Sequence, residues 1–369
     1  MNSNKQKVVY VGLSGGVDSS VSALLLKEKG YKVVGVFIDT WQPDFLDCST
    51  KEDRVDAMKV CALLNIPFKT FDAKKEYRNK VAEYMIEEYR VGRTPNPDVM
   101  CNRYVKFGLF FDWAVSEGAD FIATGHYCQT KKLINSDGTD EFHLLKGKDS
   151  NKDQSYFLWA VPVDVFSRVI FPVGDIVKSK VREIAQTNKL PTAQKKDSQG
   201  ICFLGKVDIK SFLSHYIKPK KGDVINREGE VIGYHDGAHF YTVGQRHGFT
   251  VEKKTPNSSP YYVTQKDVAK NTLEVSQSPQ QEKRAEEISL TKENWITKST
   301  LKEFESKKLT CMTRYRQKET PCQLKFNKEI LSVILDRPQQ VALGQSIVIY
   351  NGERCLGGGI IDKIKQYEF

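Results

Sequence analysis

The segment SGGVDSS, at residues 14–20, constrains this chain more than any other feature. It follows an apolar run at 8–11 and precedes an apolar segment at 21–26, which is the pattern of a buried strand, a glycine-rich turn and a helix. Gly15 and Gly16 carry no Cβ, so the backbone can bend sharply there and approach a ligand closely. The first amides of the helix would then face an anion in the turn. The segment predicts nucleotide binding, with an ordinary strand–turn–helix connection as the alternative.

The side chains of this turn add to the prediction. No lysine follows the glycines, so the segment is not the GxxxxGK[ST] phosphate loop. Ser14 and Ser19 supply hydroxyls that can bind phosphate oxygens. Asp18 supplies a carboxylate that could face a metal ion, for which Mg²⁺ beside a nucleotide is the expected choice.

Composition narrows the class of protein. The chain has 369 residues, which predicts two or three domains, and 40% hydrophobic residues with 11% aromatic residues are typical of a folded globular protein. No apolar run is long enough to span a bilayer, and the first residues lack the apolar region of a secretory signal, so we expect a cytoplasmic protein without a membrane partner. The net charge of +10 favours a polyanionic partner such as nucleic acid, although a generally basic protein would show the same excess.

The cysteines do not form a pattern that indicates disulfides or zinc. Disulfide frameworks are rare in the cytosol, and no CxxC pair occurs. Most of these cysteines are therefore expected to be small buried hydrophobic residues. The eight are Cys48, Cys61, Cys101, Cys128, Cys202, Cys311, Cys322 and Cys355.

Residues 1–205 alternate strand and helix patterns, which predicts a doubly wound parallel sheet. The strands are expected at 8–11, 32–38, 68–71 and 121–124, and the helices at 20–29, 53–64, 77–89 and 103–117. Val55, Met58 and Ala62 would form the apolar face of the second helix. Ligands bind beyond the carboxyl ends of such strands, so the glycine-rich turn and Gly125-His126 could meet at one site.

The rest of the chain changes character. Residues 206–280 are predicted to form a small β-rich central domain, with a hairpin at 222–234 around residues 227–229 and further strands at 240–243 and 261–265. The polar stretch 276–287 is interpreted as a linker. Residues 281–369 are predicted to form a small β-barrel. Its strands are expected at 310–315, 322–326, 330–335, 346–350 and 358–361.

Residues 94–107, TPNPDVMCNRYVKF, contain the first of two cysteines in unusual surroundings. Pro95 and Pro97 predict an extended loop before the next helix. Cys101 lies near the start of that helix with cations close by, a setting that lowers the pKa of a thiol. Asp98 is close enough in sequence to donate or accept a proton. A loop cysteine without a role is the alternative.

Cys202 is the second such cysteine. It follows two lysines and a glycine in KKDSQGICFLG, at residues 195–205, between two predicted domains. A flexible loop suits a thiol that must visit two places, while a buried cysteine beside Ile201 and Phe203 is the alternative.

Two further segments combine cations with aromatic rings. Residues 152–158, KDQSYFL, could hold phosphate and stack on bases, although Asp153 could simply cap a helix. The sequence Arg314-Tyr315-Arg316 is predicted on a strand, where it could bind a phosphate and stack a base or could form a solvated face.

Together these segments resemble the tRNA-specific 2-thiouridylase family, a branch of the ATP pyrophosphatase superfamily that SGGVDSS alone indicates. The resemblance covers the whole chain. It is carried, in the family's order, by TPNPDVMCNRYVKF, ATGHY at 123–127, KDQSYFL, DSQGICF at 197–203, YTVGQRHG at 241–248 and RYRQ at 314–317. It implies an adenine nucleotide alpha hydrolase-like first domain, followed by a central domain and a tRNA-binding barrel.

The resemblance also implies a role for each matching residue. ATP would contact Gly12, Leu13, Ser14, Gly15, Gly16, Val17, Asp18, Ser19, Ile38 and Gly125. Asn96, Pro97 and Asp98 would face the target uridine, with His126 and Gln345 helping to recognise the base. Lys152, Asp153, Gln154, Tyr315 and Arg316 would contact tRNA. Cys202 would carry sulfur as a persulfide, Cys101 would be the second catalytic thiol, and Asp98 would act as acid or base.

Two positions depart from the family pattern. Ile38 stands where many members have methionine, an apolar exchange that should change little. Ala342-Leu343-Gly344 replaces the usual Pro-Gly turn before Gln345, so the stiffness of that turn differs.

The implied reaction is ATP-dependent 2-thiolation of the wobble uridine in tRNAs of the Lys, Glu and Gln type, with sulfur from a persulfide donor protein. Either the Cys202 persulfide attacks the adenylated base, or hydrosulfide released from it does. Two other hypotheses are compatible with parts of the sequence: an ATP pyrophosphatase acting on a small molecule, and an RNA-binding protein with a degenerate nucleotide site. Tests of tRNA-dependent pyrophosphate release would separate the three.

Overall fold

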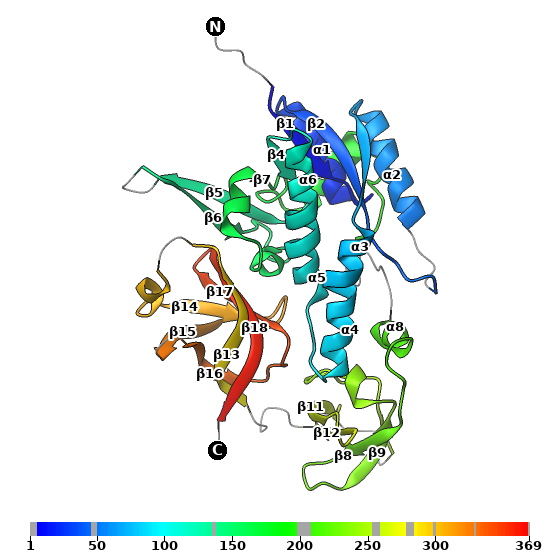
Figure 1. The fold of residues 1–369 in the computed structure, drawn as a ribbon, viewed down its shortest axis with the longest axis vertical. Helices are drawn as coiled ribbons and strands as arrows, with labels where there is room; N and C mark the ends of the chain where they lie inside the picture. Colours follow the sequence, from blue (N-terminus) through cyan, green and yellow to red (C-terminus); the bar gives the residue numbers. More distant parts are fainter. Residues whose placement is uncertain are drawn as a thin grey trace.

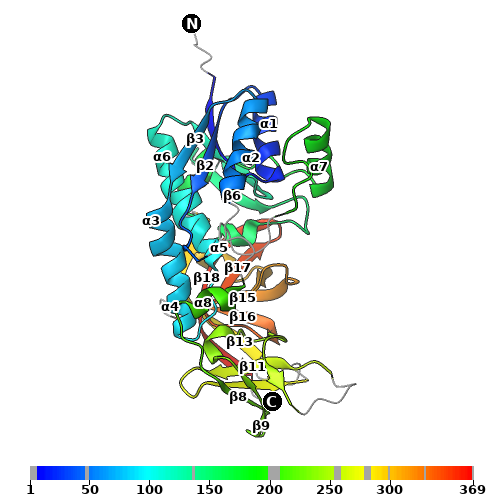
Figure 2. The same ribbon diagram turned by 90° about the vertical axis from the view of Figure 1, so that its right-hand side faces the viewer.

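A computed structural model describes residues 6–45, 50–134, 138–197, 208–252, 259–277, 284–297, 300–327 and 330–367. Figure 1 shows an α/β domain in blue and cyan at one end of the molecule, with an orange and red barrel and a yellow-green domain beyond it. The view turned by 90° in Figure 2 shows that the three parts lie along an elongated shape.

The first domain is built on a parallel sheet with the strand order β3-β2-β1-β4-β7, which confirms the predicted fold class. Its strands are β1 (Val8–Gly12), β2 (Lys32–Asp39), β3 (Phe68–Asp72), β4 (Phe121–Ala123) and β7 (Val169–Ile170). Its helical segments are α1 (Val17–Glu28), α2 (Thr50–Leu63), α3 (Lys74–Tyr77), η1 (Arg78–Ala82), α4 (Glu83–Arg90), α5 (Pro97–Met100), η2 (Cys101–Leu109), α6 (Phe110–Ser116), η3 (Ser155–Leu158), η4 (Val163–Arg168) and α7 (Lys178–Thr187).

Both faces of this sheet are covered. Val9 and Val11 of β1 are fully buried in a cluster with apolar residues of α1 and α2, while Tyr10 between them points to the other face, where its ring lies 5.7 Å from that of Trp113. Successive side chains of a strand point to opposite faces, so an uninterrupted apolar strand is what a sheet between two helical layers requires.

The predicted apolar face of α2 is wrong. Val55 and Met58 are 45% and 43% exposed, and the helix instead buries Ala57, Val60 and Cys61. The reason is the close approach of α2 to β2: a Cβ on Gly35 would lie 2.3 Å from the Cys61 sulfur. Positions 57, 60 and 61 share one helical face, so the face that carries Cys61 turns toward the sheet and leaves Val55 and Met58 exposed.

The central domain contains a five-stranded sheet with the order β10-β9-β8-β12-β11. The elements are α8 (Ile209–Ser214), β8 (Gly222–Ile225), β9 (Val231–His235), η5 (Ala238–Phe240), β10 (Thr250–Val251), β11 (Tyr262–Asp267) and β12 (Thr272–Ser276). The predicted hairpin around residues 227–229 is confirmed by the β8–β9 pairing. The strand expected at 240–243 is wrong, because Gly237 and Gly244, both with positive φ, bend the backbone on either side of it.

The C-terminal domain is a closed antiparallel barrel, as predicted. Its strands are β13 (Arg284–Trp295), β14 (Leu309–Met312), β15 (Thr320–Asn327), β16 (Ile330–Gln339), β17 (Ser346–Asn351) and β18 (Arg354–Tyr367), with η7 (Leu301–Phe304) between the first two. Pairing of β13 with both β16 and β18 closes it. The linker expected at 276–287 lies partly outside the described residues, and β13 begins at Arg284 within it.

One hairpin joins the first domain to the barrel. β5 (Cys128–Ile134) and β6 (Asp140–Lys146) follow β4 in the chain, yet β6 pairs with β18, at Arg354 with Leu145 and Cys355 with Leu144. The barrel sheet therefore extends into the α/β domain, and the two domains share backbone hydrogen bonds.

None of the helices in the part of the chain that the structure describes combines the length and the apolar character needed to cross a membrane.

Candidate functional site

The glycine-rich turn joins β1 to α1. Gly15 adopts a φ of +71°, and a Cβ there would lie 2.4 Å from the Asp53 carbonyl oxygen, so only glycine fits. Ser19 Oγ accepts a hydrogen bond of 3.2 Å from the Ser14 amide and donates one to the Gly16 carbonyl. Gly16 is the N-cap of α1 and no side chain caps the helix in the described residues, so its first amides face the turn. This end of α1 can bind an anion.

The ends of three strands meet at this turn. A Cβ on Gly125, which follows β4, would lie 2.7 Å from the Ser19 amide nitrogen and 2.9 Å from the Asp18 carbonyl carbon. Ile38 near the end of β2 is 5% exposed and lies beside Gly12. The structure thus brings together the residues predicted to bind ATP. They lie at the carboxyl end of β1, between β2 on one side and β4 on the other, where the strand order of the sheet reverses.

Asp18 is held by two partners that the sequence did not single out. Lys178 Nζ at the start of α7 donates to both Asp18 carboxylate oxygens, at 2.7 and 2.8 Å, and the Tyr127 hydroxyl donates at 2.6 Å. A Mg²⁺ ion prefers carboxylate oxygens that are open to it, together with phosphate oxygens and water. No group of three His, Cys, Asp or Glu residues in the described chain could hold a metal ion. Both Asp18 oxygens already bond to Lys178, so a Mg²⁺ ion could bind this carboxylate only by displacing the Lys178 ammonium group.

Asp197 connects the nucleotide turn to other predicted site residues. Its carboxylate accepts from Lys152 at 2.7 Å and Arg182 at 2.6 Å, and forms an ion pair of 3.0 Å with Lys178. Partial burial acts to raise the pKa of the Asp197 carboxyl, but the bonds from Lys152 and Lys178 outweigh it and lower the pKa far below its usual value. Asp197 is the first residue of the DSQGICF motif, while Cys202 lies outside the described residues.

The helix that carries Cys101 begins earlier than the sequence predicted. Pro97 does not extend the preceding loop but occupies the first turn of α5, where a missing N–H costs nothing. The Asn96 side chain caps this turn by accepting from the Val99 amide at 3.4 Å. α5 continues directly into η2, so Asp98 and Cys101 lie one turn apart on one helical face. Cys101 is fully buried.

His126 is a buried residue. It is 8% exposed, its Nδ1 lies 2.7 Å from the Thr124 hydroxyl, and the rings of Phe107 and Phe171 pack against it. Burial, with a smaller effect of the Lys106 charge, lowers its pKa well below 6.5. Its place one residue after Gly125 brings it beside the nucleotide turn.

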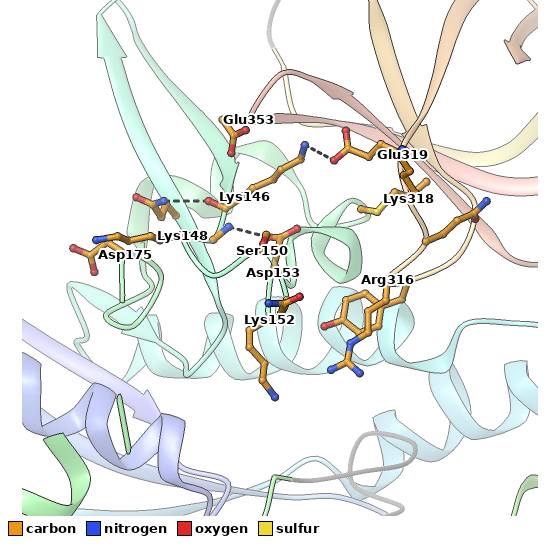
Figure 3. A pocket seen from close by; sticks show the side chains of 16 residues that line it. Lys146, Lys148, Ser150, Lys152, Asp153, Asp175, Arg316, Lys318, Glu319 and Glu353 are labelled. Carbon is orange, nitrogen blue, oxygen red and sulfur yellow. Dashed lines mark hydrogen bonds and ion pairs between the residues drawn. The ribbon is translucent and has the colours of Figure 1, made fainter. Parts of the chain in front are cut away.

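Four of the five predicted tRNA contacts, all but Gln154, line one hollow of about 980 Å³, which lies between the end of β6 and the turn after β14 (Figure 3). Lys152, Asp153, Tyr315 and Arg316 line it. Lys148 and Lys318 line it as well, and the sequence analysis missed both because single lysines carry no motif. The Lys146–Glu319 ion pair of 2.5 Å crosses between the two walls.

Two of these predicted contacts hold the protein's own backbone. Asp153 accepts from the amides of Gly147 and Ser155 and from the Ser155 hydroxyl. Burial raises its pKa, an effect that the bonds from Gly147 and Ser155 partly oppose. The Gln154 side chain accepts from the Tyr127 amide at 3.0 Å, which ties it to the loop after β4.

The strand predicted for Arg314-Tyr315-Arg316 is wrong. β14 ends at Met312, and the three residues form a turn in which Arg316 has a φ of +62°. On a strand, Arg314 and Arg316 would point to one face and Tyr315 to the other. In a turn this alternation is lost. The Tyr315 ring packs on Phe157 at 4.4 Å, so the aromatic residues of the two predicted tRNA segments are in contact.

Gln345 lies beside the loop before α5. Its side-chain nitrogen donates to the carbonyl oxygens of Thr94 at 2.9 Å and Pro95 at 3.1 Å. The sequence offered no signal for this contact, which spans 251 residues of chain.

Comparison with known proteins gives consistent matches along the chain. A tRNA methyl transferase HUP domain matches residues 7–206, a tRNA methyl transferase PRC-barrel domain matches 210–277, and an aminomethyltransferase beta-barrel domain matches 285–361. The tRNA-specific 2-thiouridylase MnmA of Streptococcus mutans is 43% identical, over 100% of this chain and 98% of that protein. The proteins of the same name from Pseudomonas putida and Bacillus subtilis are 45% and 43% identical, each over 96% of this chain and over 94% and 95% of theirs.

Proposed function

Because this chain belongs to the tRNA-specific 2-thiouridylase family, and is therefore an ATP-using tRNA sulfurtransferase that makes 2-thiouridine, we propose that its target is the wobble uridine and that Cys202 carries the sulfur. The matching domain families bear the words methyl transferase in their names. The full-length relatives extend across all three domains and are named thiouridylases, so they define the activity.

The observation that carries the proposal is the position of Asp197. One carboxylate contacts Lys178, which holds Asp18 in the nucleotide turn, and Lys152, which lines the hollow between β6 and the turn after β14. Cys202 follows five residues later, and five residues extend at most about 18 Å. A sulfur carrier at position 202 would therefore act within about 18 Å of Asp197, a residue that contacts both Lys178 and Lys152.

The chemistry begins with activation of the base. The O2 oxygen of uracil is a poor leaving group, and its attack on the α-phosphate of ATP releases pyrophosphate and turns it into a good one. The amides at the start of α1 would stabilise the negative charge on the phosphates. Asp98, one helical turn before Cys101, would act as the general acid or base that exchanges a proton with the target uracil. No step is assigned to Mg²⁺.

Sulfur transfer then follows one of two routes. In the first, the terminal sulfur of the Cys202 persulfide attacks C2, AMP leaves, and Cys101 attacks the Cys202 sulfur. Thiouridine is released and a Cys101–Cys202 disulfide remains for an external thiol to reduce. In the second, Cys101 attacks the persulfide first and hydrosulfide attacks C2. Cys101 is fully buried, so either route requires that the start of η2 be uncovered.

The substrates of this site would be tRNAs of the Lys, Glu and Gln type, and the sulfur would come from a persulfide donor protein. The net charge of +10 supports a polyanionic partner. The hollow contributes five cationic side chains beside four carboxylates, and the cations are Lys146, Lys148, Lys152, Arg316 and Lys318. The test is to incubate the purified protein with ATP, a persulfide donor and each tRNA, and to measure pyrophosphate and 2-thiouridine together. Pyrophosphate released equally without tRNA, with no thiouridine formed, would contradict the proposal.

A hydrosulfide trap, added under limiting reductant, distinguishes the two routes. During turnover of persulfidated enzyme, the first route predicts a reducible Cys101–Cys202 bridge that peptide mapping under non-reducing conditions detects. The second route also ends in this bridge, but a hydrosulfide trap would then stop thiolation. Thiolation at the normal rate by Cys101→Ser would remove Cys101 from both.

A further inference from the structure

We propose that the C-terminal barrel positions the loop at residues 93–97 of the first domain, called here the base-facing loop, and that the barrel acts on this loop through Gln345 as the positioning residue. The inference rests on the proposed function, because it concerns the placement of Asn96 and Asp98 against the target base.

The Gln345 side chain is committed to the loop backbone. Its amide nitrogen has two hydrogens, and two carbonyl oxygens, those of Thr94 and Pro95, lie 2.9 and 3.1 Å from it. Both donors are therefore used within the protein. Reading a base through the same nitrogen would require breaking these bonds, whereas holding the loop uses them as they stand.

The backbone that presents Gln345 is itself fixed in the barrel. The Gln345 carbonyl accepts from the Ile361 amide at 2.8 Å, and the Gly344 amide donates to the Ile361 carbonyl at 2.9 Å. Gly344 has a φ of +89°, and a Cβ there would lie 3.0 Å from the Thr94 amide nitrogen. The turn at 342–345 thus fits against the loop without space for a larger residue.

A second set of contacts fixes the loop at Arg93. Its guanidinium bonds Glu88 of α4 at 2.9 Å, Asp362 of β18 at 2.9 Å and the Ile361 carbonyl at 3.1 Å. The next amide, of Thr94, donates to the Leu343 carbonyl at 2.8 Å. Three consecutive residues, 93–95, are therefore bonded to the barrel.

The central domain reaches the same point. The Thr94 hydroxyl lies 3.1 Å from that of Thr242, in the YTVGQRHG segment, and Thr94 is 7% exposed. All three domains contact one residue of the loop.

The contacts that hold residues 93–95 also restrict the position of Asn96 and of the helix that follows it. Proline fixes its own φ, and both Pro95 and Pro97 flank Asn96, so few torsions separate the anchored carbonyls from the residues that would face the base. Asn96 in turn caps the helix that carries Asp98 and Cys101. A shift of the barrel would move these groups together.

The test measures amide hydrogen exchange across residues 96–101 in the full-length enzyme without tRNA, and then thiolation kinetics. Gln345→Ala is expected to speed exchange of this segment several-fold and to lower kcat about tenfold, since two hydrogen bonds are lost, while the Kd for tRNA changes less than twofold. Gln323→Ala, an exposed glutamine on β15 of the same barrel, is the matched control and should change neither.

Gln345→Glu adds a readout specific to positioning. A carboxylate would face two carbonyl oxygens, so at pH 7.5 this variant should lose more activity than Gln345→Ala. As the pH falls and the carboxyl is protonated, its O–H can donate again, and the protection factors of the segment, compared at each pH with those of the wild type, should rise toward the wild-type values. Arg93→Lys, which keeps the charge but loses the planar fork, should speed the same exchange if either glutamine variant fails to fold.

Unchanged exchange in folded Gln345→Ala, with a weakened Kd for tRNA, would overturn the inference and favour direct base recognition. Failure of the proposed function looks different, because wild-type enzyme would then make no thiouridine whatever the exchange rates.

Discussion

Ser14 in the nucleotide turn bonds to a residue five positions along the chain, whereas Gln345 beside the base-facing loop bonds to one 251 positions away. The nucleotide turn is shaped by its own glycines, serines and the start of α1. The loop at 93–97 and the hollow take shape only where the first domain meets the barrel. Short-range contacts cost little chain entropy to form, and long-range contacts depend on the packing of whole domains.

The difference teaches that ATP binding and tRNA handling should respond differently to substitution. Changes near α1 should act locally on adenylation, whereas changes in the barrel should act at a distance on the first domain. Loss of the sulfur carrier should leave both regions intact.

The largest effect is expected for Cys202→Ser. Thiolation should fall below detection, because no side chain at this position could carry a persulfide, while the Kd values for ATP and tRNA change less than twofold. Mass spectrometry of tRNA hydrolysates and binding titrations measure the two. Cys48→Ser is the control and should thiolate normally. Wild-type thiolation by Cys202→Ser would remove this residue from the mechanism.

Asp18→Ala should have the next largest effect and keep it local. It leaves Lys178 without the carboxylate that now holds it at 2.7 and 2.8 Å, and loss of such charged hydrogen bonds predicts about a 100-fold slower release of pyrophosphate. The Kd for tRNA should change little. Asp164→Ala, at an exposed carboxylate in η4, is the control. If tRNA binding weakened as much as pyrophosphate release, the two regions would not be independent.

Arg316→Ala should affect tRNA binding and leave ATP binding unchanged, the reverse of Asp18→Ala. Its side chain lines the hollow, so its removal should weaken tRNA binding and reduce the slope of log Kd against log salt by about one, with ATP binding unchanged. Arg314→Ala removes an equal charge from an exposed neighbour outside the lining of the hollow. An equal change of slope in both variants would show that only the net charge matters.

The smallest effect concerns pH and His126. Its folded-state pKa lies below the 6.5 of the unfolded chain, so the unfolded state binds a proton first as the pH falls. The free energy of unfolding of the first domain should therefore decrease below pH 6.5, by at most about 1.4 kcal/mol per pH unit. Urea titrations from pH 7.5 to 5 measure it. The slope should shrink in His126→Asn, and a slope equal to that of the wild type would mean that other groups cause it.

The same contrast separates what the sequence could and could not predict. The strands of the parallel sheet were predictable because β1 and β2 are continuous apolar runs. The nucleotide turn was predictable because its residues are adjacent in the chain. Lys178 was not, because a lone lysine at the start of a polar helix resembles many solvated ones.

The pairing of β6 with β18 could not be predicted from the sequence for a related reason. β5 and β6 include the polar stretch at 129–132, and their partner strand lies more than two hundred residues later, so no local pattern indicates the pairing. The predicted roles of Cys202 and the disulfide lie outside the described residues and stay predictions.

The β5–β6 hairpin also has a consequence for synthesis of the chain. β6 emerges from the ribosome roughly 210 residues before Arg354, the residue with which Leu145 pairs. At about 5–20 residues per second, its edge stays without that partner for roughly 10 to 40 seconds. An exposed strand edge is a template for pairing with other chains. Chains truncated before β18 should therefore aggregate through this hairpin, because β18 is the strand that covers the edge of β6.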